Sequence, residues 1–255
     1  MTNLFKASTR SVAIVHALLS CIAIIGVFFI EFTLDHALMM IASFFVLNII
    51  GMHMMMHRYY SHSYFKFKSK WLLRFFTLIS ILCTRGSPIG WVYVHRMHHA
   101  KADTHEDPIG PISQGFKLFG FYDNLRVSYE FKMNPLLVKS LMNKEQVFIN
   151  TYYWLIVAAV VVPLMLVSFD VFYFIYVLPI LMLEVSFNLF NYFNHKSGYK
   201  NYHKKDQSTN NFWLWFLNFG EAWHNNHHGE PSKLSTHHKW WEIDPVVYLI
   251  KAVAR

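Results

Sequence analysis

Charged residues, cysteines and linkers are scarce in this chain, and each scarcity excludes a class of protein. Only 15% of its 255 residues are charged, whereas a soluble domain carries about 25%. The two cysteines, Cys21 and Cys83, lie in apolar runs and are predicted to be free thiols, so no disulfide framework is expected. The sequence contains no repeat, low-complexity tract or flexible linker. With 54% hydrophobic and 18% aromatic residues, it indicates a protein with apolar surface facing lipid.

Four long apolar stretches predict membrane-spanning helices, because crossing a bilayer takes about 20 mostly apolar residues. They are roughly Val12–Phe32, Ala37–Met56, Tyr152–Phe169 and Val171–Phe190. Few residues separate the members of each pair, so the pattern predicts two helical hairpins. The first stretch is too long for a signal peptide and lacks a small-residue cleavage site.

The positions of the basic residues test this topology. The net charge of +8 alone is compatible with nucleic acid, membrane phosphates or an acidic protein partner. With four spans, however, all 23 Lys and Arg residues lie on one side of the membrane, which the positive-inside rule makes cytoplasmic. A fifth apolar run, Trp71–Cys83, is 13 residues long and contains Arg74. Because a crossing there would break the segregation, we expect an interfacial or re-entrant helix.

These observations predict an all-α integral membrane protein with one domain, residues 1–255. Four transmembrane helices form two hairpins, and the central segment and tail form a cytoplasmic helical cap. Both termini lie in the cytoplasm. The expected membrane is the bacterial inner membrane, or the endoplasmic reticulum if the source is eukaryotic.

Histidine is abundant, with 16 residues, and half of the histidines fall into three short boxes. These are His57-Arg-Tyr-Tyr-Ser-His62, His95-Arg-Met-His-His99 and His224-Asn-Asn-His-His228. The last two share the spacing i, i+3, i+4, which on a helix places three imidazoles within an arc of about 100°. The helix of the second box is expected to begin at Ser87-Pro88 and to end before Asp107-Pro108.

Nine histidines are predicted to gather on the cytoplasmic face, namely His57, His62, His95, His98, His99, His195, His224, His227 and His228. Imidazole binds iron, zinc, copper and nickel, and a closed structural zinc site needs only four ligands. Nine imidazoles with the neutral Asn191, four residues before His195, therefore suit two metals with room for water or oxygen. Soluble di-iron bundles use carboxylates and two Glu-x-x-His pairs, but this chain has one such spacing, Glu221-x-x-His224.

The remaining histidines are expected to be structural or on the surface. They are His16, His36, His105, His203, His237 and His238. His53 lies one turn before His57, but we favour a structural role for it as well.

The wording of the boxes resembles that of membrane fatty acyl desaturases. The first box resembles the family's HRxxSH and the second matches HRxHH. Residues 220–228 are similar to GEGxHNxHH, with Ala222 in place of a glycine. Asn191-x3-His195 matches the NxxxH element of the stearoyl-CoA, or delta-9, branch. The resemblance extends from about residue 10 to 245, and further departures at Met55, Val94 and residues 229–231 remove no candidate ligand.

This resemblance implies a di-iron centre, two Fe²⁺ ions held by the nine histidines, with Asn191 acting through a water. It implies an oxygen-dependent oxidoreductase that uses O₂ and two electrons to introduce a cis double bond, expected at delta-9. The acyl chain is carried by CoA, acyl carrier protein or a membrane lipid. A separate electron donor, ferredoxin or cytochrome b5, is implied because the chain has no fused cytochrome module and no flavin or nicotinamide fingerprint. No nucleic acid partner is expected.

A polar stripe on the fourth span is also a candidate for function. Glu184, Asn188, Asn191 and His195 lie at i, i+4, i+7 and i+11, and ionisable groups within spans are costly and often functional. Glu184, with Asn188 and Glu221, is a candidate for orienting a group beside the ligands or the wall of an apolar substrate tunnel. The alternative for Glu184 is a protonated carboxyl bonded to a neighbouring helix.

Two rival functions stay open. An alkyl, sterol or carotenoid hydroxylase of the same superfamily carries a His-x3-His first box, which His53-x3-His57 also fits. A membrane metal transporter or sensor is more remote, because transport sites lie along a path within the membrane and these ligands gather at one interface.

Overall fold

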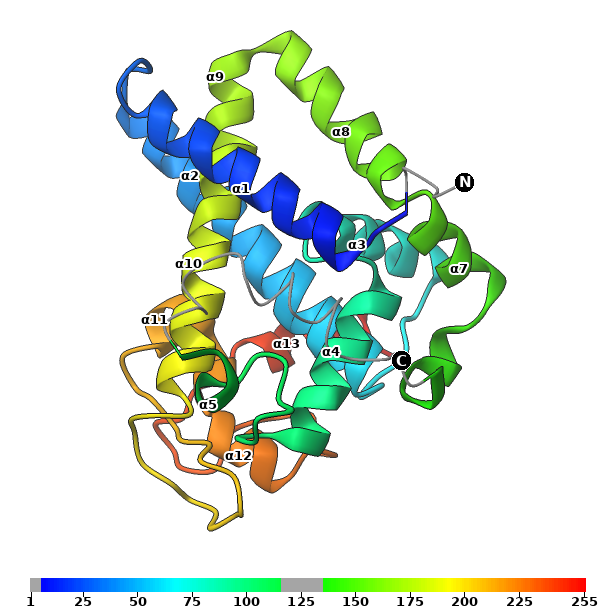
Figure 1. The fold of residues 1–255 in the computed structure, drawn as a ribbon, viewed down its shortest axis with the longest axis vertical. Coiled ribbons are helices and arrows are strands. Elements are labelled where there is room, and N and C mark those ends of the chain that lie inside the picture. Colours follow the sequence, from blue (N-terminus) through cyan, green and yellow to red (C-terminus); the bar gives the residue numbers. More distant parts are fainter. Residues whose placement is uncertain (1–5, 116–134) are drawn as a thin grey trace.

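The computed structural model describes residues 6–115 and 135–255, and within them the chain is helical (Figure 1). The described residues form no strand, only isolated bridges such as Phe67 with Ala254. Both cysteines are free. The predictions of an all-α fold and of free thiols are therefore confirmed for this part of the chain.

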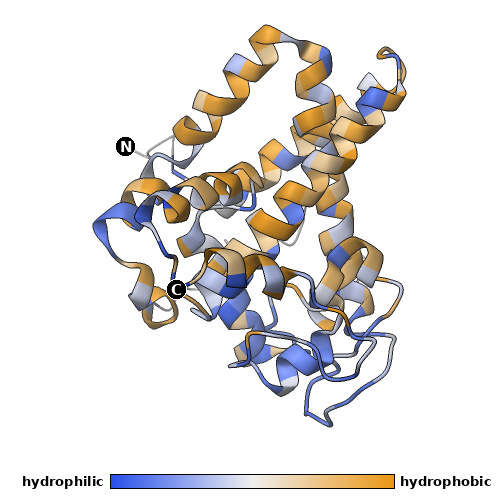
Figure 2. Cartoon of the chain, turned by 180° about the vertical axis from the view of Figure 1, so that it is seen from behind, coloured by the Kyte–Doolittle hydropathy of each residue, from blue (hydrophilic) through white to orange (hydrophobic). Residues whose placement is uncertain are grey.

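The four apolar stretches form the long helices in the upper part of Figure 1. The helices are α1 (Thr9–Gly26), α2 (Leu34–Phe45) continuing as η1 (Val46–Ser61), α8 (Tyr153–Val167), and α9 (Phe169–Phe172) continuing through η4 (Tyr173–Val177) into α10 (Leu178–Phe193). Hydrophobic residues dominate these helices, and hydrophilic residues gather at the opposite end of the molecule (Figure 2).

Two continuous helices are long and apolar enough to cross a membrane, Leu34–Ser61 and Phe169–Phe193. A third candidate arises if α7 (Lys144–Thr151) and α8, which meet at a bend of 62°, count as one broken span. The first predicted span corresponds to a shorter apolar helix, Arg10–Gly26. Two or three membrane helices thus follow from the structure, while the four-span topology stays a prediction.

Polar side chains cap the N-termini of several helices. Ser8 and Ser11 form a capping box at α1, and Thr33 and His36 form another at α2. Ser87 accepts a hydrogen bond from the Gly90 N–H, and Pro88 is the first residue of α4 (Pro88–Lys101). The helix of the second histidine box therefore begins and ends as expected.

The short apolar run forms α3 (Lys70–Leu82), a helix of 13 residues. Its outer face carries Trp71, 77% exposed, and Phe75, 58% exposed. Its inner side packs against η1, where the Cys83 thiol donates to the Leu47 carbonyl over 3.2 Å. An amphipathic helix with exposed aromatics is typical of the membrane interface rather than of a span.

The first histidine box lies at the end of an unusual element. η1 is a π-helix of 16 residues, a form that is rare and usually limited to one turn at functional sites. Its i+5 hydrogen bonds include His62 N–H to the His57 carbonyl, 3.2 Å. On an α-helix, residues five apart diverge by about 140°. The wider turn instead brings the His57 and His62 rings to 4.9 Å, centroid to centroid.

The tail folds beneath the spans as α11 (Trp215–Asn218), η5 (Phe219–Ala222), α12 (His224–Gly229) and α13 (Val246–Val253), close to the short α5 (Pro111–Gln114) in Figure 1. The 3₁₀ helix η3 (Pro135–Leu141) packs against α4. Asn48 donates to the Leu217 carbonyl over 2.6 Å, and Phe45 contacts the Phe219 ring. These contacts fix the tail against α2 and η1, and so position the third histidine box.

Candidate metal centre

The structure brings the nine predicted histidines together in two groups. One contains five of them, His57, His62, His95, His99 and His227, and the other contains four, His98, His195, His224 and His228. Within each group, one ring nitrogen from every member lies within 4.8 Å of the others. Among the described residues, no other histidine belongs to either group.

The two groups share the same pair of helices. On α4, His95 and His99 point to the five-histidine group, whereas His98 belongs to the four-histidine group. On α12, His224 and His228 belong to the four-histidine group and His227 to the other. The i, i+3, i+4 spacing therefore distributes each box between two sites. The sequence analysis placed the three imidazoles of each box on one side of a helix and did not predict that they would belong to two sites.

Nitrogen atoms of different imidazoles lie close together in both groups. The Nε2 atoms of His57 and His227 are 3.1 Å apart. The His62–His95 pair is at 2.8 Å and the His195–His224 pair at 3.0 Å. Two ligand nitrogens at ~2.1 Å from one ion and at right angles to each other would lie about 3.0 Å apart. The observed spacing fits imidazoles that share a metal.

Four carboxylates fix the outer nitrogens of these rings. In the four-histidine group, the Nδ1 atom of His98 lies 2.9 Å from Asp107, that of His195 lies 2.9 Å from Asp103, and that of His228 lies 3.4 Å from Asp206. In the five-histidine group, the Nδ1 atom of His57 lies 2.6 Å from Glu221. A carboxylate only accepts, so Nδ1 carries the proton and the Nε2 lone pair is free for a metal. Of the four, the sequence singled out only Glu221.

The three aspartates had a weak sequence signal. Acidic residues number only 15 in the chain, and Asp103 and Asp107 follow the second box within eight residues. Asp206 lies midway between His195 and the third box. Which ring each aspartate pairs with depends on the tertiary fold, and the local sequence spacing does not predict it.

Protonation states and unpaired atoms agree with a metal site. Burial, followed by repulsion from neighbouring histidines, holds the pKa values of His95, His224 and His227 well below the ordinary 6.5. These rings are neutral and can ligate at neutral pH. The Nε2 atoms of His98 and His228 are buried without a hydrogen-bond partner. Buried polar atoms of this kind need a partner, and a cation would supply it.

The pKa of Asp107 shifts in the direction that suits its role. Burial opposes the charged form, but the neighbouring His98 and backbone N–H donors of Asp103 and Ile109 outweigh it and lower this pKa below its ordinary value. Asp107 is therefore ionised when it holds the His98 ring.

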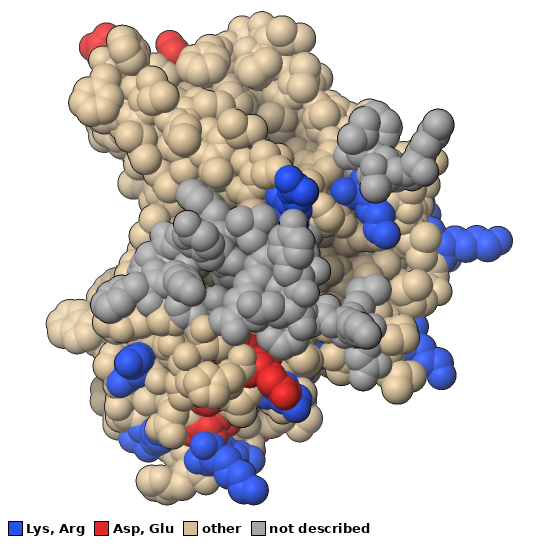
Figure 3. Space-filling view, viewed as in Figure 1, with Lys and Arg blue, Asp and Glu red and all other residues tan. Residues whose placement is uncertain are grey.

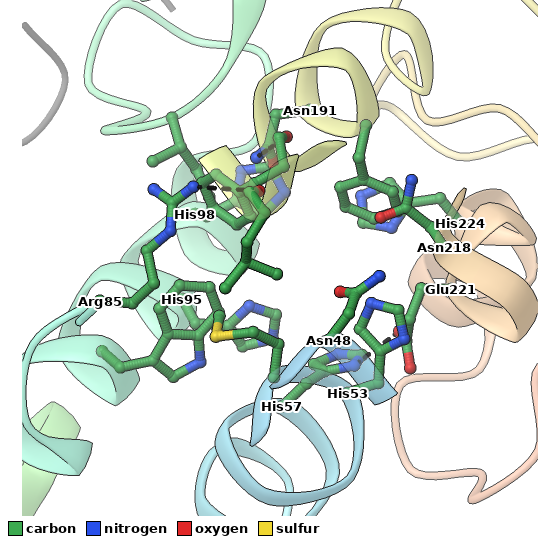
Figure 4. A pocket seen from close by; sticks show the side chains of 16 residues that line it. Asn48, His53, His57, Arg85, His95, His98, Asn191, Asn218, Glu221 and His224 are labelled. Atoms are coloured by element: carbon green, nitrogen blue, oxygen red, sulfur yellow. Dashed lines mark hydrogen bonds and ion pairs between the residues drawn. The ribbon is translucent and has the colours of Figure 1, made fainter. Parts of the chain in front are cut away.

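A pocket with about 590 Å³ of empty space, part of it open to solvent, lies against both groups, on the side of the apolar helices. Figure 4 shows Arg85 and His95 on one side of it, and Asn218 and His224 on the other. Half of the other lining residues are apolar, namely Met52, Trp91, Ile109, Leu183, Phe187 and Phe190, and half are polar, namely Asn48, His53, His57, His98, Asn191 and Glu221. The cavity is suited to an apolar chain whose carbon atoms approach the histidines.

Asn191 lies in the cavity wall (Figure 4). Its side chain is buried, and its amide N–H donates to the Phe187 carbonyl over 2.9 Å. The amide oxygen remains available to a water beside the four-histidine group.

Glu184 is bonded to neighbouring elements rather than to a histidine of either group. Its carboxylate lies 2.6 Å from His16 Nδ1 and 2.9 Å from Arg85, and accepts from Asn188 over 3.0 Å. The Arg85 guanidinium in turn covers the Phe187 ring at 4.2 Å and lines the cavity. Glu184 therefore holds part of the cavity wall through Arg85. The sequence analysis did not single out Arg85.

Replacing Glu184 with Gln is expected to lower stability by ~3–5 kcal/mol, because Arg85 would keep a buried charge without its partner. Glu145→Gln is the matched control, since its pair with Arg74 is about half exposed and such pairs contribute below about 1 kcal/mol. Thermal unfolding in detergent measures both variants. An unchanged unfolding midpoint and unchanged product chain length in Glu184→Gln would remove both the structural and the tunnel-wall role.

The other histidines take the places expected of structural residues. His16 binds Thr84 and Glu184 inside the helix bundle, and His36 forms the α2 cap. His53 lines the cavity but joins neither histidine group. His105, His203, His237 and His238 likewise lie outside both groups.

Two histidine groups that could each hold a metal ion lie beneath apolar helices, an arrangement typical of a membrane-associated metalloprotein. Comparison with known proteins narrows the class, because the family model described as fatty acid desaturase matches residues 32–255. The chain belongs to the fatty acid desaturase family. It is therefore an oxygen-dependent oxidoreductase of the membrane-bound acyl desaturase type.

Several curated relatives carry desaturase names. The chain is 32% identical over 222 residues to the "Acyl-CoA C20 Delta5-desaturase" of Anemone leveillei, covering 82% of this chain and 68% of the relative. It is 32% identical over 202 residues to the "sn-1 stearoyl-lipid 9-desaturase" of Anabaena variabilis, covering 76% and 72%. It is 29% identical over 224 residues to the "Hex-5-enoyl-[acyl-carrier protein] acetylenase" of Moorena producens, covering 78% and 68%.

Proposed function

We propose that this protein introduces a cis double bond at the delta-9 position of a fatty acyl chain, at a di-iron centre held by its nine clustered histidines. The observation that carries the proposal is the division of these histidines into groups of five and four beside an apolar cavity. Delta-9 activity has support from the NxxxH element and from relatives named 9-desaturases. The relatives' names include CoA, acyl carrier protein and lipid carriers.

In the proposed site, the five-histidine group holds one iron and the four-histidine group holds the other, with Asn191 acting through a water. Iron held there would supply oxygen activation: O₂, two electrons and two protons, with two hydrogens from adjacent methylenes, would give the alkene and two waters. A methylene has neither an acidic proton nor a leaving group, so acid–base side chains alone do not suffice.

The chain's own residues perform binding, orientation and exclusion of water. The carboxylates on Nδ1 keep the rings in one tautomer and direct Nε2 inward. Leu183, Phe187 and Phe190 offer an apolar surface on which an acyl chain excludes water from the cavity. Arg85, held by Glu184 and stacked on Phe187, keeps this wall in place.

The proposed topology is the four-span arrangement of a single domain, with both termini and the site in the cytoplasm. On the face in Figure 3, Lys and Arg lie in the middle and lower parts of the molecule, and the upper end shows acidic but no basic residues. Glu31 lies between α1 and α2, and Asp35 and Asp170 lie in the first turns of α2 and α9. This asymmetry follows the positive-inside rule.

Ferredoxin or a cytochrome b5-like protein is the proposed electron donor. A basic cytoplasmic face attracts acidic partners and accelerates their docking, in a manner that salt screens. The same face also attracts anionic lipid headgroups. An electron-transfer rate that falls as ionic strength rises supports docking on this face, and a salt-insensitive rate contradicts it.

Expression in a desaturase-deficient host tests the proposed reaction. Gas chromatography and mass spectrometry of the host fatty acids should reveal a new cis alkene at delta-9. A hydroxylated chain instead would favour the rival hydroxylase, and an alkene at another position would correct the regiochemistry. Purified protein that moves zinc or copper into vesicles without oxidising lipid would favour the transporter.

A further inference from the structure

The two histidine groups differ in what lies behind their imidazole rings. In the four-histidine group, three of the four rings face a carboxylate through Nδ1, and all four residues are buried. The carboxylates belong to Asp103, Asp107 and Asp206. The corresponding imidazole side chains are 0%, 1% and 3% exposed.

One described cation lies beside these aspartates, the Lys200 ammonium, which donates to the Asp206 backbone carbonyl over 3.1 Å and not to its carboxylate. Within residues 6–115 and 135–255, neither a lysine nor an arginine forms an ion pair with any of the three aspartates. Their other partners are neutral donors, such as the Gln207 N–H to Asp103 and the Ser208 N–H to Asp206. A cation inside the group is therefore the natural counter-charge.

The five-histidine group has fewer carboxylates and more positive charge around its rings. Glu221 is the one carboxylate paired with its rings among the described residues, and Arg58 binds the same carboxylate over 2.9 Å. Arg96 adds a further positive charge beside His62, as its guanidinium donates to the Ser61 carbonyl over 2.8 Å. His62 and His99 are also partly exposed, so this group is open to solvent.

Both differences act on metal retention in the same direction. A carboxylate behind a ligating imidazole raises its basicity, and its loss typically costs about 10–100-fold in affinity. Charges act more strongly where water is excluded, whereas an open edge admits water and chelators. The fifth imidazole of the other group opposes these effects, but it adds no charge.

We propose that the two metal positions are unequal: the four-histidine group retains its ion, and the five-histidine group exchanges its ion through the edge formed by His62 and His99. This inference rests on the proposed ligand set. It makes the four-histidine position the first to fill. Activity then follows the filling of the five-histidine position, so the protein responds to the supply of iron.

Chelator-driven release from the purified protein tests this proposal. The detergent-solubilised chain is loaded with iron(II) without oxygen, mixed with bipyridine and desalted at intervals, and the iron remaining per chain is measured by mass spectrometry. We expect two phases of one ion each, with rates at least ~10-fold apart. A single phase that releases both ions would overturn the inequality, and a chain that never binds iron would instead overturn the ligand set.

Isosteric variants assign the phases. Asp107→Asn and Asp206→Asn, on separate segments, should each accelerate the slow phase by ~10-fold or more and leave the fast phase unchanged. Glu106→Gln is the matched control, because this exposed acid pairs with Lys101 and not with a histidine. Acceleration of the fast phase alone in both aspartate variants would reverse the assignment and contradict the proposal.

Discussion

Replacing His98 with alanine is expected to reduce desaturation to the background of the host. The His98 Nε2 atom is buried without a partner, and Asp107 fixes the opposite nitrogen at 2.9 Å. The variant would leave the four-histidine group with three members. Loss of a direct ligand should exceed the ~10–100-fold that loss of an outer carboxylate costs.

Product analysis by mass spectrometry, normalised to the amount of folded protein in the membrane, measures this effect. His105→Ala is the matched control, since His105 is exposed and joins neither group. We expect wild-type product from the control. Wild-type product from His98→Ala would mean that His98 is not a ligand.

Replacing Arg58 with methionine should have the largest effect on stability. Arg58 is fully buried and lies 2.9 Å from Glu221 and 3.0 Å from Asp244. Its removal leaves two buried carboxylates without a counter-charge, and breaking a single buried pair already costs ~3–5 kcal/mol. Because Glu221 also holds His57, the loss should extend to the five-histidine group.

Arg74→Met is the control for this variant, because Arg74 is 56% exposed and its pair with Glu145 is accessible to solvent. Thermal unfolding of detergent-solubilised protein should place the control within about 1 kcal/mol of wild type. Arg58→Lys should recover only part of the loss, since an ammonium lacks the planar fork that reaches two carboxylates. Equal midpoints for Arg58→Met and wild type would contradict this account of the buried network.

The sequence predicted which histidines assemble but not how they divide. All nine candidates lie in the two groups, because the spacing of each box survives folding. The division depends on what packs against each side of α4 and α12, and a helical wheel does not contain this information. The i+5 spacing of His57 and His62 was likewise visible in the sequence. The π-helix that brings these two rings together depends on the packing of η1, which the sequence does not reveal.

The supporting charges were the hardest part to predict. Glu221 was found because it lies three residues before His224, but Asp103 and Asp206 reach histidines far from them in sequence, with His195 lying 92 residues from Asp103. Arg58 lies inside the first histidine box, and the sequence analysis considered only the histidines of that box, so it did not predict the pairing of Arg58 with Glu221 and Asp244.

For Glu184, the alternative was a protonated carboxyl bonded to a neighbouring helix. The contact with His16 on α1 fits the neighbouring helix, but the ion pair with Arg85 indicates a charged carboxylate rather than a protonated one.

Iron content tests the central claim most directly. The full chain, purified in detergent from cells grown with ample iron, should contain close to two iron ions per chain and little zinc, as expected for two groups of five and four imidazoles. A chain that contains a single zinc ion or no metal, while folded and able to oxidise acyl chains, would contradict the account.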